Sequence, residues 1–290
     1  MGGFFLSFPK KANQRKEQMK RISFFIYLVL ILNCNISIAQ SYKSDKNIGE
    51  TFLSDFNHFF DVGIGLLNSP LSFSQGERLA TVGITGATAL LFTVDKNIKS
   101  FALSNQTQLN DNIFAIDEFY GSGYTPLLTA TIYGYGLFTR NREIRKLGLH
   151  ASEALIYSVA ITTALKILIG RRRPYAGESQ LFLKPFQISN NDLQSLPSGH
   201  TTAVFAVSTV MAKYSDNIYW KIFWYGSATL VGFSRIYHNK HWTSDVFLGA
   251  GIGYSVGEFI SNFDKKSTEY FGVKLNPYFT FNKIGFILKF

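Results

Sequence analysis

Three short clusters of polar and charged residues lie in order along the middle of this chain. They are Lys166 to Pro174 (KILIGRRRP), Pro197 to His200 (PSGH) and Ser234 to Asp245 (SRIYHNKHWTSD). A phosphoryl group in transfer spreads negative charge over its equatorial oxygens, so fixed cations and N–H donors supply most of the catalysis. The clusters combine cations, histidines and a carboxylate, and therefore indicate phosphoryl transfer without a metal.

Three of the cationic side chains are candidates to hold phosphate oxygens, namely Lys166, Arg173 and Arg235. An Arg side chain can contact phosphate with two N–H groups at once, whereas a Lys side chain acts as a point charge. We expect the three to surround one phosphate group. The alternative is that Arg171, Arg172 and Arg173 form a basic anchor at a membrane interface.

The PSGH segment stands directly before an apolar run from Thr201 to Met211, which predicts a helix. Ser198 is suited to the N-cap of this helix, next to Gly199 and His200. Backbone amides at a helix N-terminus bind anions. The segment therefore predicts an anion site, although PSGH by itself is weak evidence because such residues are common in turns.

The histidines must divide two tasks, because transfer from an ester requires a nucleophile and a proton for the leaving alkoxide. His241 is followed four residues later by Asp245, a spacing that places both on one helical face and lets the carboxylate hold one imidazole tautomer. We interpret His241 as the nucleophile and His200 as the general acid. Asp245 as a simple helix cap is the alternative.

Together the clusters resemble the signature of the type 2 phosphatidic acid phosphatase and vanadium haloperoxidase superfamily, over about residues 75–262. The matching positions are Lys166, Arg173 and Pro174; Pro197, Ser198, Gly199 and His200; and Ser234, Arg235, His241 and Asp245. The resemblance implies that His241 forms a phosphohistidine, that Asp245 orients it and that His200 protonates the leaving group. It also implies that the phosphate oxygens are held by Lys166, Arg173, Ser198, Gly199 and Arg235.

Six apolar runs separated by polar loops predict helices over Ala80–Val94, Tyr124–Phe138, Leu149–Ile169, Thr201–Met211, Ile218–Phe233 and Val246–Ile260. The predicted fold is all-α, a six-helix bundle. Lys166 and Arg173 end the third helix, PSGH opens the fourth, and the segment from Arg235 to Asp245 joins the last two. Because antiparallel neighbours return to the same end of a bundle, we expect the active site at one end.

Two further patterns concern the end of the chain. Gly249, Gly253 and Gly257 recur every four residues and predict a close helix contact. Apolar residues then alternate in period two on both sides of Asn282 and Lys283, which predicts a short C-terminal β-hairpin.

The chain divides into four predicted parts: an export signal over 1–40, an amphipathic lead-in over 41–74, the phosphatase helical bundle over 75–262 and the hairpin tail over 263–290. In the first part, Lys20 and Arg21 precede the apolar stretch Ile22–Leu32, and Ile36–Gln40 offers small residues to a signal peptidase. The real start could be Met19.

The net charge of +10 suits anionic substrates or an anionic membrane surface. The basic residues are scattered and no nucleic-acid module is recognisable, so we expect no nucleic-acid partner. A spanning helix needs about 20 apolar residues, and only Leu149–Ile169 approaches this length. We expect membrane association with the active site facing the periplasm, and a soluble periplasmic form is the alternative. The oligomeric state is not predicted.

The remaining histidines give little indication of a metal or cofactor. His238 and His241 are three residues apart, but no other His or Cys clusters with them, so we predict no metal and no cofactor. His58 and His150 have no evident chemical partners in the sequence. Glu153 lies inside an apolar run and is predicted to be a buried polar partner.

The sequence thus predicts a metal-independent phosphatase that acts on a lipid phosphate or an isoprenoid diphosphate, or on a small phosphate ester. A vanadate-dependent haloperoxidase is the first alternative, because vanadate and phosphate share a tetrahedral shape and charge. A non-enzymatic envelope protein that binds anionic lipid is the second.

Overall fold

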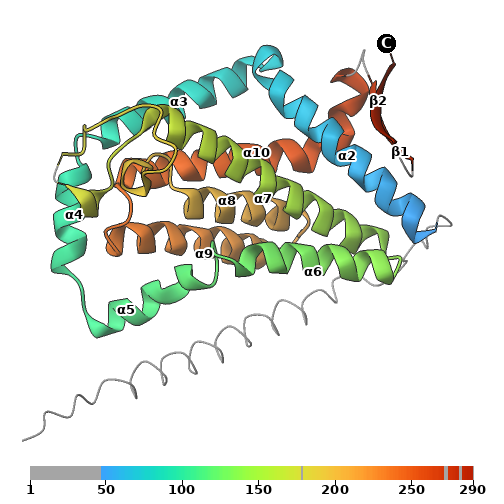
Figure 1. Cartoon of the computed structure of the whole chain (residues 1–290). Coiled ribbons are helices and arrows are strands. Elements are labelled where there is room, and N and C mark those ends of the chain that lie inside the picture. The colour runs from blue at the N-terminus through green and yellow to red at the C-terminus, as the bar shows by residue number, and fades with distance from the viewer. Residues whose placement is uncertain (1–46, 178, 271–273, 281–282, 290) are drawn as a thin grey trace, which may run out of the picture. The chain divides into compact units, whose positions relative to one another are not determined.

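The structure is a computed structural model, and it describes residues 47–177, 179–270, 274–280 and 283–289. Most of these residues are helical (Figure 1). The helices are α2 (Ile48–Asn68), α3 (Gln75–Leu91), α4 (Asp95–Ser104), α5 (Gln108–Phe114), α6 (Tyr124–Phe138), α7 (Arg142–Ile169), α8 (Gly199–Lys213), α9 (Ile218–Tyr237) and α10 (Thr243–Tyr270). Short 3₁₀ turns lie between them: η1 (Ser69–Ser72), η2 (Ala115–Glu118), η3 (Pro174–Ala176) and η4 (Asn191–Leu193).

The all-α prediction is confirmed, but the count of six helices is too low. Each predicted helix has a counterpart, in α3 and in α6 to α10. The sequence reading missed α2, α4 and α5. The apolar residues of α2 are separated by acidic residues and His58, and α4 and α5 are short and polar. None of these helices therefore has a long apolar run. Helix α2 nevertheless contributes Val62, which is fully buried, to the core.

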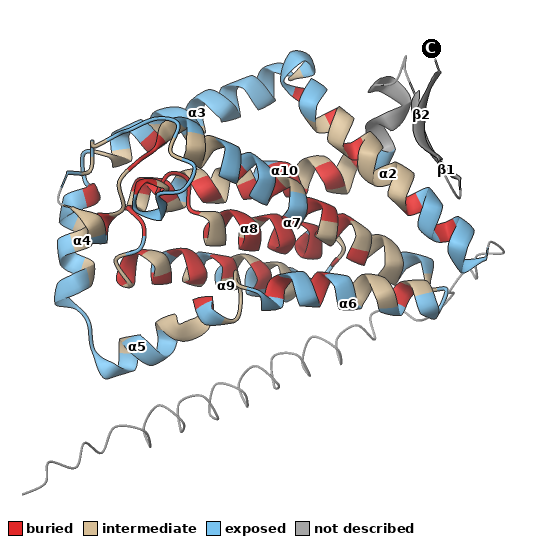
Figure 2. Ribbon diagram, in the orientation of Figure 1, coloured by how far each residue is buried: buried red, intermediate tan, exposed pale blue. Residues whose placement is uncertain are grey.

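Helix α8 lies at the centre of the bundle. It packs against α7, α9 and α10, and α6 packs along α7 (Figure 1). Its residues from Thr201 to Ala212 are almost all buried, as Figure 2 shows by the red along this helix. A helix that is apolar on all sides belongs in the interior. The main apolar cluster joins α8 to α2, α7 and α10 and consists of Val62, Ala151, Ala154, Ala206, Val210, Val256, Ile260 and Phe263.

The predicted glycine contact is present between α10 and α8. A Cβ atom at Gly249 would lie 2.7 Å from the Ser198 carbonyl oxygen, and one at Gly257 would lie 2.7 Å from the Ala206 carbonyl oxygen. At Gly253 it would lie 2.9 Å from the Ala206 nitrogen and still closer to the Thr202 oxygen. Real Cβ atoms do not approach backbone this closely, so only glycine allows α10 to lie against α8 at this separation.

Helix α10 continues to Tyr270, beyond the predicted end of the bundle at residue 262. The strands β1 (Lys274–Thr280) and β2 (Lys283–Lys289) follow and pair antiparallel, with Lys274 opposite Lys289 and Thr280 opposite Lys283. The predicted export signal at 1–40 lies outside the described residues.

Candidate active site

The three sequence clusters meet at one end of the bundle, where α7 ends and α8 and α10 begin. Helix α7 ends at Gly170, whose φ of 62° is in the left-handed region that favours glycine. A Cβ atom there would overlap the Lys184 carbonyl oxygen, because the following loop returns directly over the helix end. This return leads the chain back to Ser198 and the start of α8.

The N-terminus of α8 is the place where the sequence predicts an anion site, and its capping differs from the expectation. Ser198 occupies the N-cap position, but its side chain does not cap the helix. Instead its Oγ accepts a hydrogen bond from Thr201 Oγ1, and its backbone N–H donates to the Asp245 carbonyl oxygen over 2.9 Å. The first amides of a helix have no partner within the helix. Those of Gly199 and His200 are in that position, beside the Lys166 side chain.

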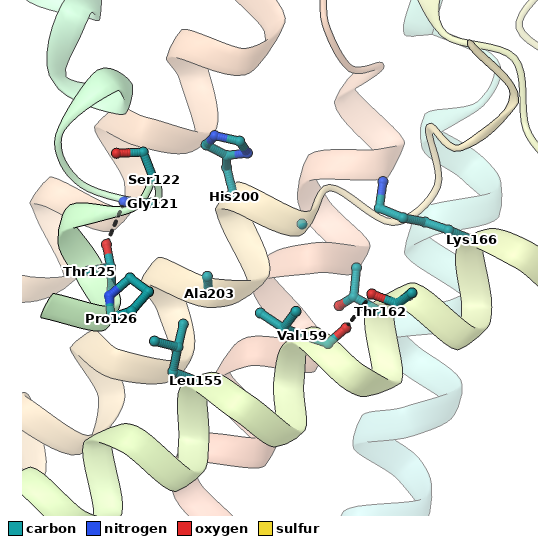
Figure 3. Close-up of a pocket in the computed structure, with 12 residues that line it drawn as sticks. Gly121, Ser122, Thr125, Pro126, Leu155, Val159, Thr162, Lys166, His200 and Ala203 are labelled. Carbon is teal, nitrogen blue, oxygen red and sulfur yellow. Dashed lines mark hydrogen bonds between the residues drawn. The ribbon is translucent and has the colours of Figure 1, made fainter. Parts of the chain in front are cut away.

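The three predicted cations line this end of the bundle and have different protein partners. Lys166 Nζ donates to the Gln194 carbonyl oxygen over 2.5 Å. Arg235 Nη1 pairs with Asp117. Arg173 Nη1 lies 3.2 Å from His241 Nε2 and 3.2 Å from the Lys240 carbonyl oxygen. In Figure 3 the side chains of Lys166 and His200 extend from α7 and α8 toward the same side of the pocket.

The contact between Arg173 and His241 identifies the tautomer of the imidazole. A guanidinium group can only donate hydrogen bonds, so His241 Nε2 must be the acceptor and carry a lone pair. The proton of the neutral ring is then on Nδ1, which lies 3.5 Å from Asp245 Oδ2. This distance is too long for a well-formed hydrogen bond, and Nδ1 has no such partner among the described residues. The ring therefore presents an unprotonated Nε2 to the site.

His241 and Asp245 are close together, but not through a helical turn. Helix α10 begins at Thr243, so His241 precedes it. Asp245 accepts a hydrogen bond from the Trp242 amide over 2.9 Å and so caps the helix start, and its Oδ2 also accepts from Ser195 Oγ over 2.5 Å. The carboxylate is therefore both a cap and a neighbour of His241.

A buried ion network behind Asp245 was not predicted from the sequence. Arg171 is fully buried and donates to Asp245 Oδ1 over 2.6 Å and to Asp95 Oδ2 over 2.7 Å. Asp95 also accepts from the backbone and side chain of Ser244. The Arg171–Arg173 run is therefore not a single basic anchor. Its first residue is internal, Arg172 stacks on Phe182, and the third faces the site. A single sequence gives no signal of this burial.

Asp117, in η2, is a second residue that the sequence did not indicate. It is buried, pairs with Arg235 and lies 3.4 Å from His238 Nδ1. Burial raises the pKa of Asp117, but hydrogen bonds from His238 and Arg235 lower it by a larger amount. The net pKa is therefore below the usual range. Asp117 is therefore ionised and keeps Arg235 in place.

The two histidines of the site have low pKa values for the same physical reasons. Burial and the positive charges of Lys166 and Arg173 lower the pKa of His241 well below its usual value. Burial, then the charge of Arg235, lowers the pKa of His200 to about 4. Both rings are thus neutral at pH 7 in the empty site. Their shared positive neighbours agree with one common anion-binding centre.

Two adjoining cavities open beside these groups. One has a volume of about 430 Å³ and is lined by Asp117, Glu118, Ser122, His200, Arg235, His238 and Lys240. The other, of about 200 Å³, extends between α6, α7 and α8 and is shown in Figure 3. Its walls include Leu155, Val159 and Ala203, and it ends at Lys166 and His200. A polar chamber and a more apolar one thus meet at His200.

Residues 147–269 match the model of the PAP2 superfamily. This range contains all three clusters, and the chain therefore carries a PAP2 superfamily domain. The chain is 27% identical over 244 residues to lipid A 1-phosphatase of Porphyromonas gingivalis, an alignment that covers 83% of this chain and 50% of that protein. It thus spans about half the length of this curated relative.

Two solved structures match part of this chain. The first is a transmembrane PAP2 type phosphatidylglycerolphosphate phosphatase from Bacillus subtilis, with a TM-score of 0.50 and 22% identity, covering 66% of this chain and 98% of the other. The second is LpxE from Aquifex aeolicus, with a TM-score of 0.46 and 23% identity, covering 58% of this chain and 94% of the other. At this identity the first shows the helical fold alone.

Proposed function

We propose that this protein is a metal-independent phosphatase that hydrolyses a lipid phosphate or an isoprenoid diphosphate through a phosphohistidine. The observation that carries the proposal is the 3.2 Å contact of Arg173 with His241 Nε2, which places the lone pair on Nε2 while Nδ1 faces Asp245. A nucleophilic imidazole needs its lone pair on the attacking nitrogen and an orienting group behind the other.

In the proposed reaction, the phosphate displaces the contact between Arg173 and His241. Its oxygens take hydrogen bonds from Lys166, Arg173 and Arg235 and from the amides at the start of α8. His241 Nε2 attacks phosphorus and forms a P–N bond, while the bond from phosphorus to the ester oxygen breaks and His200 gives its proton to that oxygen. Water then attacks phosphorus, His200 takes a proton from the water, and the P–N bond breaks.

The proton that His200 donates has to arrive with the substrate. Because the pKa of His200 is about 4 in the empty site, the free protein at pH 7 lacks this proton. A phosphate monoester has a second pKa of about 6, so a fraction of the substrate enters as the monoanion. Inside the site the phosphate negative charge favours the protonated ring. His200 thus becomes the acid only when substrate is bound.

A lipid substrate is supported by the surroundings of the site. The smaller cavity carries apolar walls from α7 and α8 up to His200, where the leaving oxygen would lie. The molecule also exposes large apolar residues on several helices, among them Leu79, Val82 and Leu90 on α3, Leu127 and Phe138 on α6, Ile156 on α7, and Tyr219 and Ile222 on α9. Exposed apolar surface on this scale is typical of contact with a membrane.

We further propose that the protein is membrane-associated, with the active-site end facing the periplasm. Among the described residues, α7 is the one helix long and apolar enough to cross a membrane, with 28 residues and a mean hydropathy of 1.5 over an 18-residue window. The signal-like N-terminal sequence and the outward apolar side chains agree with this location. Labelling of a Lys240→Cys variant in intact cells by a membrane-impermeant thiol reagent tests it, and exclusive labelling after lysis would contradict it.

The activity is tested by phosphate release from phosphatidic acid, phosphatidylglycerol phosphate, lipid A 1-phosphate, undecaprenyl diphosphate and p-nitrophenyl phosphate, with and without EDTA. We expect release from at least one lipid with the chelator present. His241→Ala should abolish turnover and leave phosphate binding largely intact. Rapid quenching should trap an acid-labile phosphoenzyme in the wild type and none in this variant. Unchanged hydrolysis by His241→Ala would remove this residue from the mechanism.

The role of His200 is tested by comparing leaving groups. General acid catalysis contributes about 10²- to 10⁴-fold. We expect His200→Gln to lose this factor with an alkyl or lipid ester and much less with p-nitrophenyl phosphate, whose leaving group needs no proton. His238→Gln is the matched control and should show no such difference between substrates. A protein that oxidises bromide with vanadate and peroxide, but releases no phosphate, would instead support the haloperoxidase alternative.

A further inference from the structure

A second cluster of histidines and carboxylates lies toward the other end of α7. His58 comes from α2, His150 and Glu153 from α7, and Asp264 from α10. His58 Nδ1 lies 2.8 Å from Glu153 Oε1, and its Nε2 lies 2.9 Å from Asp264 Oδ1. The rings of His58 and His150 stack with their centroids 5.5 Å apart. Three helices therefore converge on one polar centre inside the protein.

Each of the two histidines has one ring nitrogen that contacts a residue other than His58, His150 and Glu153. For His58 this nitrogen is Nε2, which faces Asp264. For His150 it is Nδ1, which lies 3.1 Å from the Tyr214 hydroxyl group. Metal-binding histidines have this arrangement, because an outer carboxylate or hydroxyl fixes the ring and leaves the other nitrogen for the ion.

Two inner atoms of the cluster, on His150 and Glu153, lack hydrogen-bond partners among the described residues. His150 is 1% exposed and Glu153 is fully buried. Among the described residues, His150 Nε2 and Glu153 Oε2 have no hydrogen-bond partner. Buried polar atoms of this kind are unfavourable and need an explanation. Ligand atoms from His58, His150 and Glu153 all lie within 4.8 Å of one another, so a single ion can satisfy them together.

We propose that His58, His150 and Glu153 bind one divalent transition metal ion of the Zn²⁺ type. Two imidazole nitrogens and one carboxylate oxygen are a ligand set that suits this class of ion and not Mg²⁺ or Ca²⁺. The ligands of a tetrahedral zinc ion lie about 3.4 Å apart, so small rotations of the side chains would complete the site. Asp264 holds the His58 ring from behind.

Binding requires the loss of a proton. In the absence of metal, one proton lies between His58 Nδ1 and the Glu153 carboxylate. The His58 nitrogen and a Glu153 oxygen each bind the ion through a lone pair. This proton is therefore released to solvent as the ion enters. The binding step therefore exchanges one metal ion for one proton, in addition to the water that the ion loses.

The proposed ion would be structural, because it lies far from the catalytic end. Along α7, His150 precedes Lys166 by sixteen residues, which corresponds to roughly 24 Å of helix. The ion would join α2, which packs beside the bundle, to α7. The proposal does not depend on the proposed enzymatic function, and its test uses binding rather than turnover.

The test uses the full chain in detergent after removal of metals with a chelator. Zn²⁺ is titrated by calorimetry in weakly buffered solution with a pH indicator, and Co²⁺ is titrated by its visible ligand-field absorption. We expect one ion and one released proton per chain, and an intense tetrahedral Co²⁺ spectrum. Absence of saturable binding, or binding without the spectrum of nitrogen and oxygen ligands, would overturn the proposal.

Variants locate the ion among the five histidines of the chain. His150→Gln and Glu153→Gln remove ligands and should weaken binding by more than about 100-fold, because the loss of an outer partner alone costs about 10- to 100-fold. The matched controls His238→Gln and His241→Gln remove imidazoles at the catalytic end and should bind as the wild type does. Equal affinity in the ligand variants, or loss of binding only in the controls, would refute the assignment.

If a ligand variant does not fold, a second variant still tests the proposal. Tyr214→Phe keeps the ring and removes only the hydroxyl group that faces His150 Nδ1. We expect circular dichroism equal to that of the wild type and an affinity lower by about 10-fold or more. Unchanged affinity in this folded variant would contradict the proposed geometry.

Discussion

Arg171 pairs with Asp245, the proposed orienting carboxylate, from inside the protein, and its replacement by Lys tests that supporting role. All five guanidinium N–H groups are used. Nη1 donates to Asp245 and Ser244, Nη2 to Asp95 and to the Gln180 carbonyl oxygen, and Nε to that same oxygen. The guanidinium carbon also lies 3.8 Å from the centre of the Phe92 ring. A Lys side chain retains the charge but has only three N–H groups.

The expected loss of stability follows from the number of these hydrogen bonds. At least two of these five hydrogen bonds from a charged donor disappear in Arg171→Lys, and the acceptors Asp95, Asp245 and Ser244 are buried. Loss of one such bond costs about 1–3 kcal/mol. The free energy of unfolding should therefore fall by about 2–6 kcal/mol, which is a large part of the 5–15 kcal/mol typical of a folded protein. Activity should fall as well, because Asp245 is then held less firmly beside His241.

The measurement compares Arg171→Lys with Arg172→Lys by thermal and denaturant unfolding in the same detergent. Arg172 is the matched control, because its side chain is partly exposed and stacks on Phe182. The control should change stability by less than about 1 kcal/mol, since exposed charged contacts contribute little. Equal destabilisation by both substitutions would refute the reasoning that the buried hydrogen bonds of Arg171 organise the site.

Three further predictions test other parts of the site. First, kcat/KM for a soluble alkyl ester, whose leaving group needs a proton, should be highest between about pH 4, set by His200, and about pH 6, set by the phosphate, and should fall about tenfold per pH unit above it. Below this window a second proton binds, and above it none is left for the leaving group, so a constant value up to pH 8 would contradict the mechanism. Second, Asp117→Asn removes the charged partner of Arg235 and should lower kcat/KM about 10- to 100-fold, since such hydrogen bonds contribute about 1.5–3 kcal/mol. Glu118→Gln in the same cavity should have little effect, and similar losses in both would argue against a specific role. Third, Gly253→Ala introduces a Cβ against the backbone of α8 and should destabilise the protein by about 1–3 kcal/mol or more in chemical unfolding. Gly226→Ala, which has open space in α9, should be neutral or stabilising, and the reverse order would disprove the close contact.

The residues at the ends of helices could be found from the sequence, because their positions follow from the chain itself. Lys166 precedes a glycine that ends α7, and PSGH precedes the apolar run of α8. An antiparallel arrangement then brings these ends together whatever the details of packing. The glycines of α10 were recognisable for a similar reason, because their fourfold spacing lies on one face of a helix.

The partners of these residues could not be predicted in the same way. Asp95 and Asp117 lie far from the clusters in sequence and belong to short polar elements, α4 and η2. Nothing local distinguishes them from exposed acidic residues. Their roles depend on Arg171 and Arg235, which reach them only after the bundle has formed. The cluster of His58, His150 and Glu153 was missed for the same reason, because it joins helices that are distant in sequence.

The close contact between α8 and α10 has a direct consequence for the chemistry. The general acid candidate His200 stands on the first turn of α8, and the nucleophile candidate His241 stands just before α10. The two helix starts are joined by the hydrogen bond from the Ser198 amide to the Asp245 carbonyl oxygen. This bond requires the backbones to touch, and Gly249 allows them to do so because any Cβ there would meet the Ser198 carbonyl. The separation of the two imidazoles is therefore determined by backbone contacts between rigid helices, which is the condition for positioning two catalytic groups around one phosphorus atom.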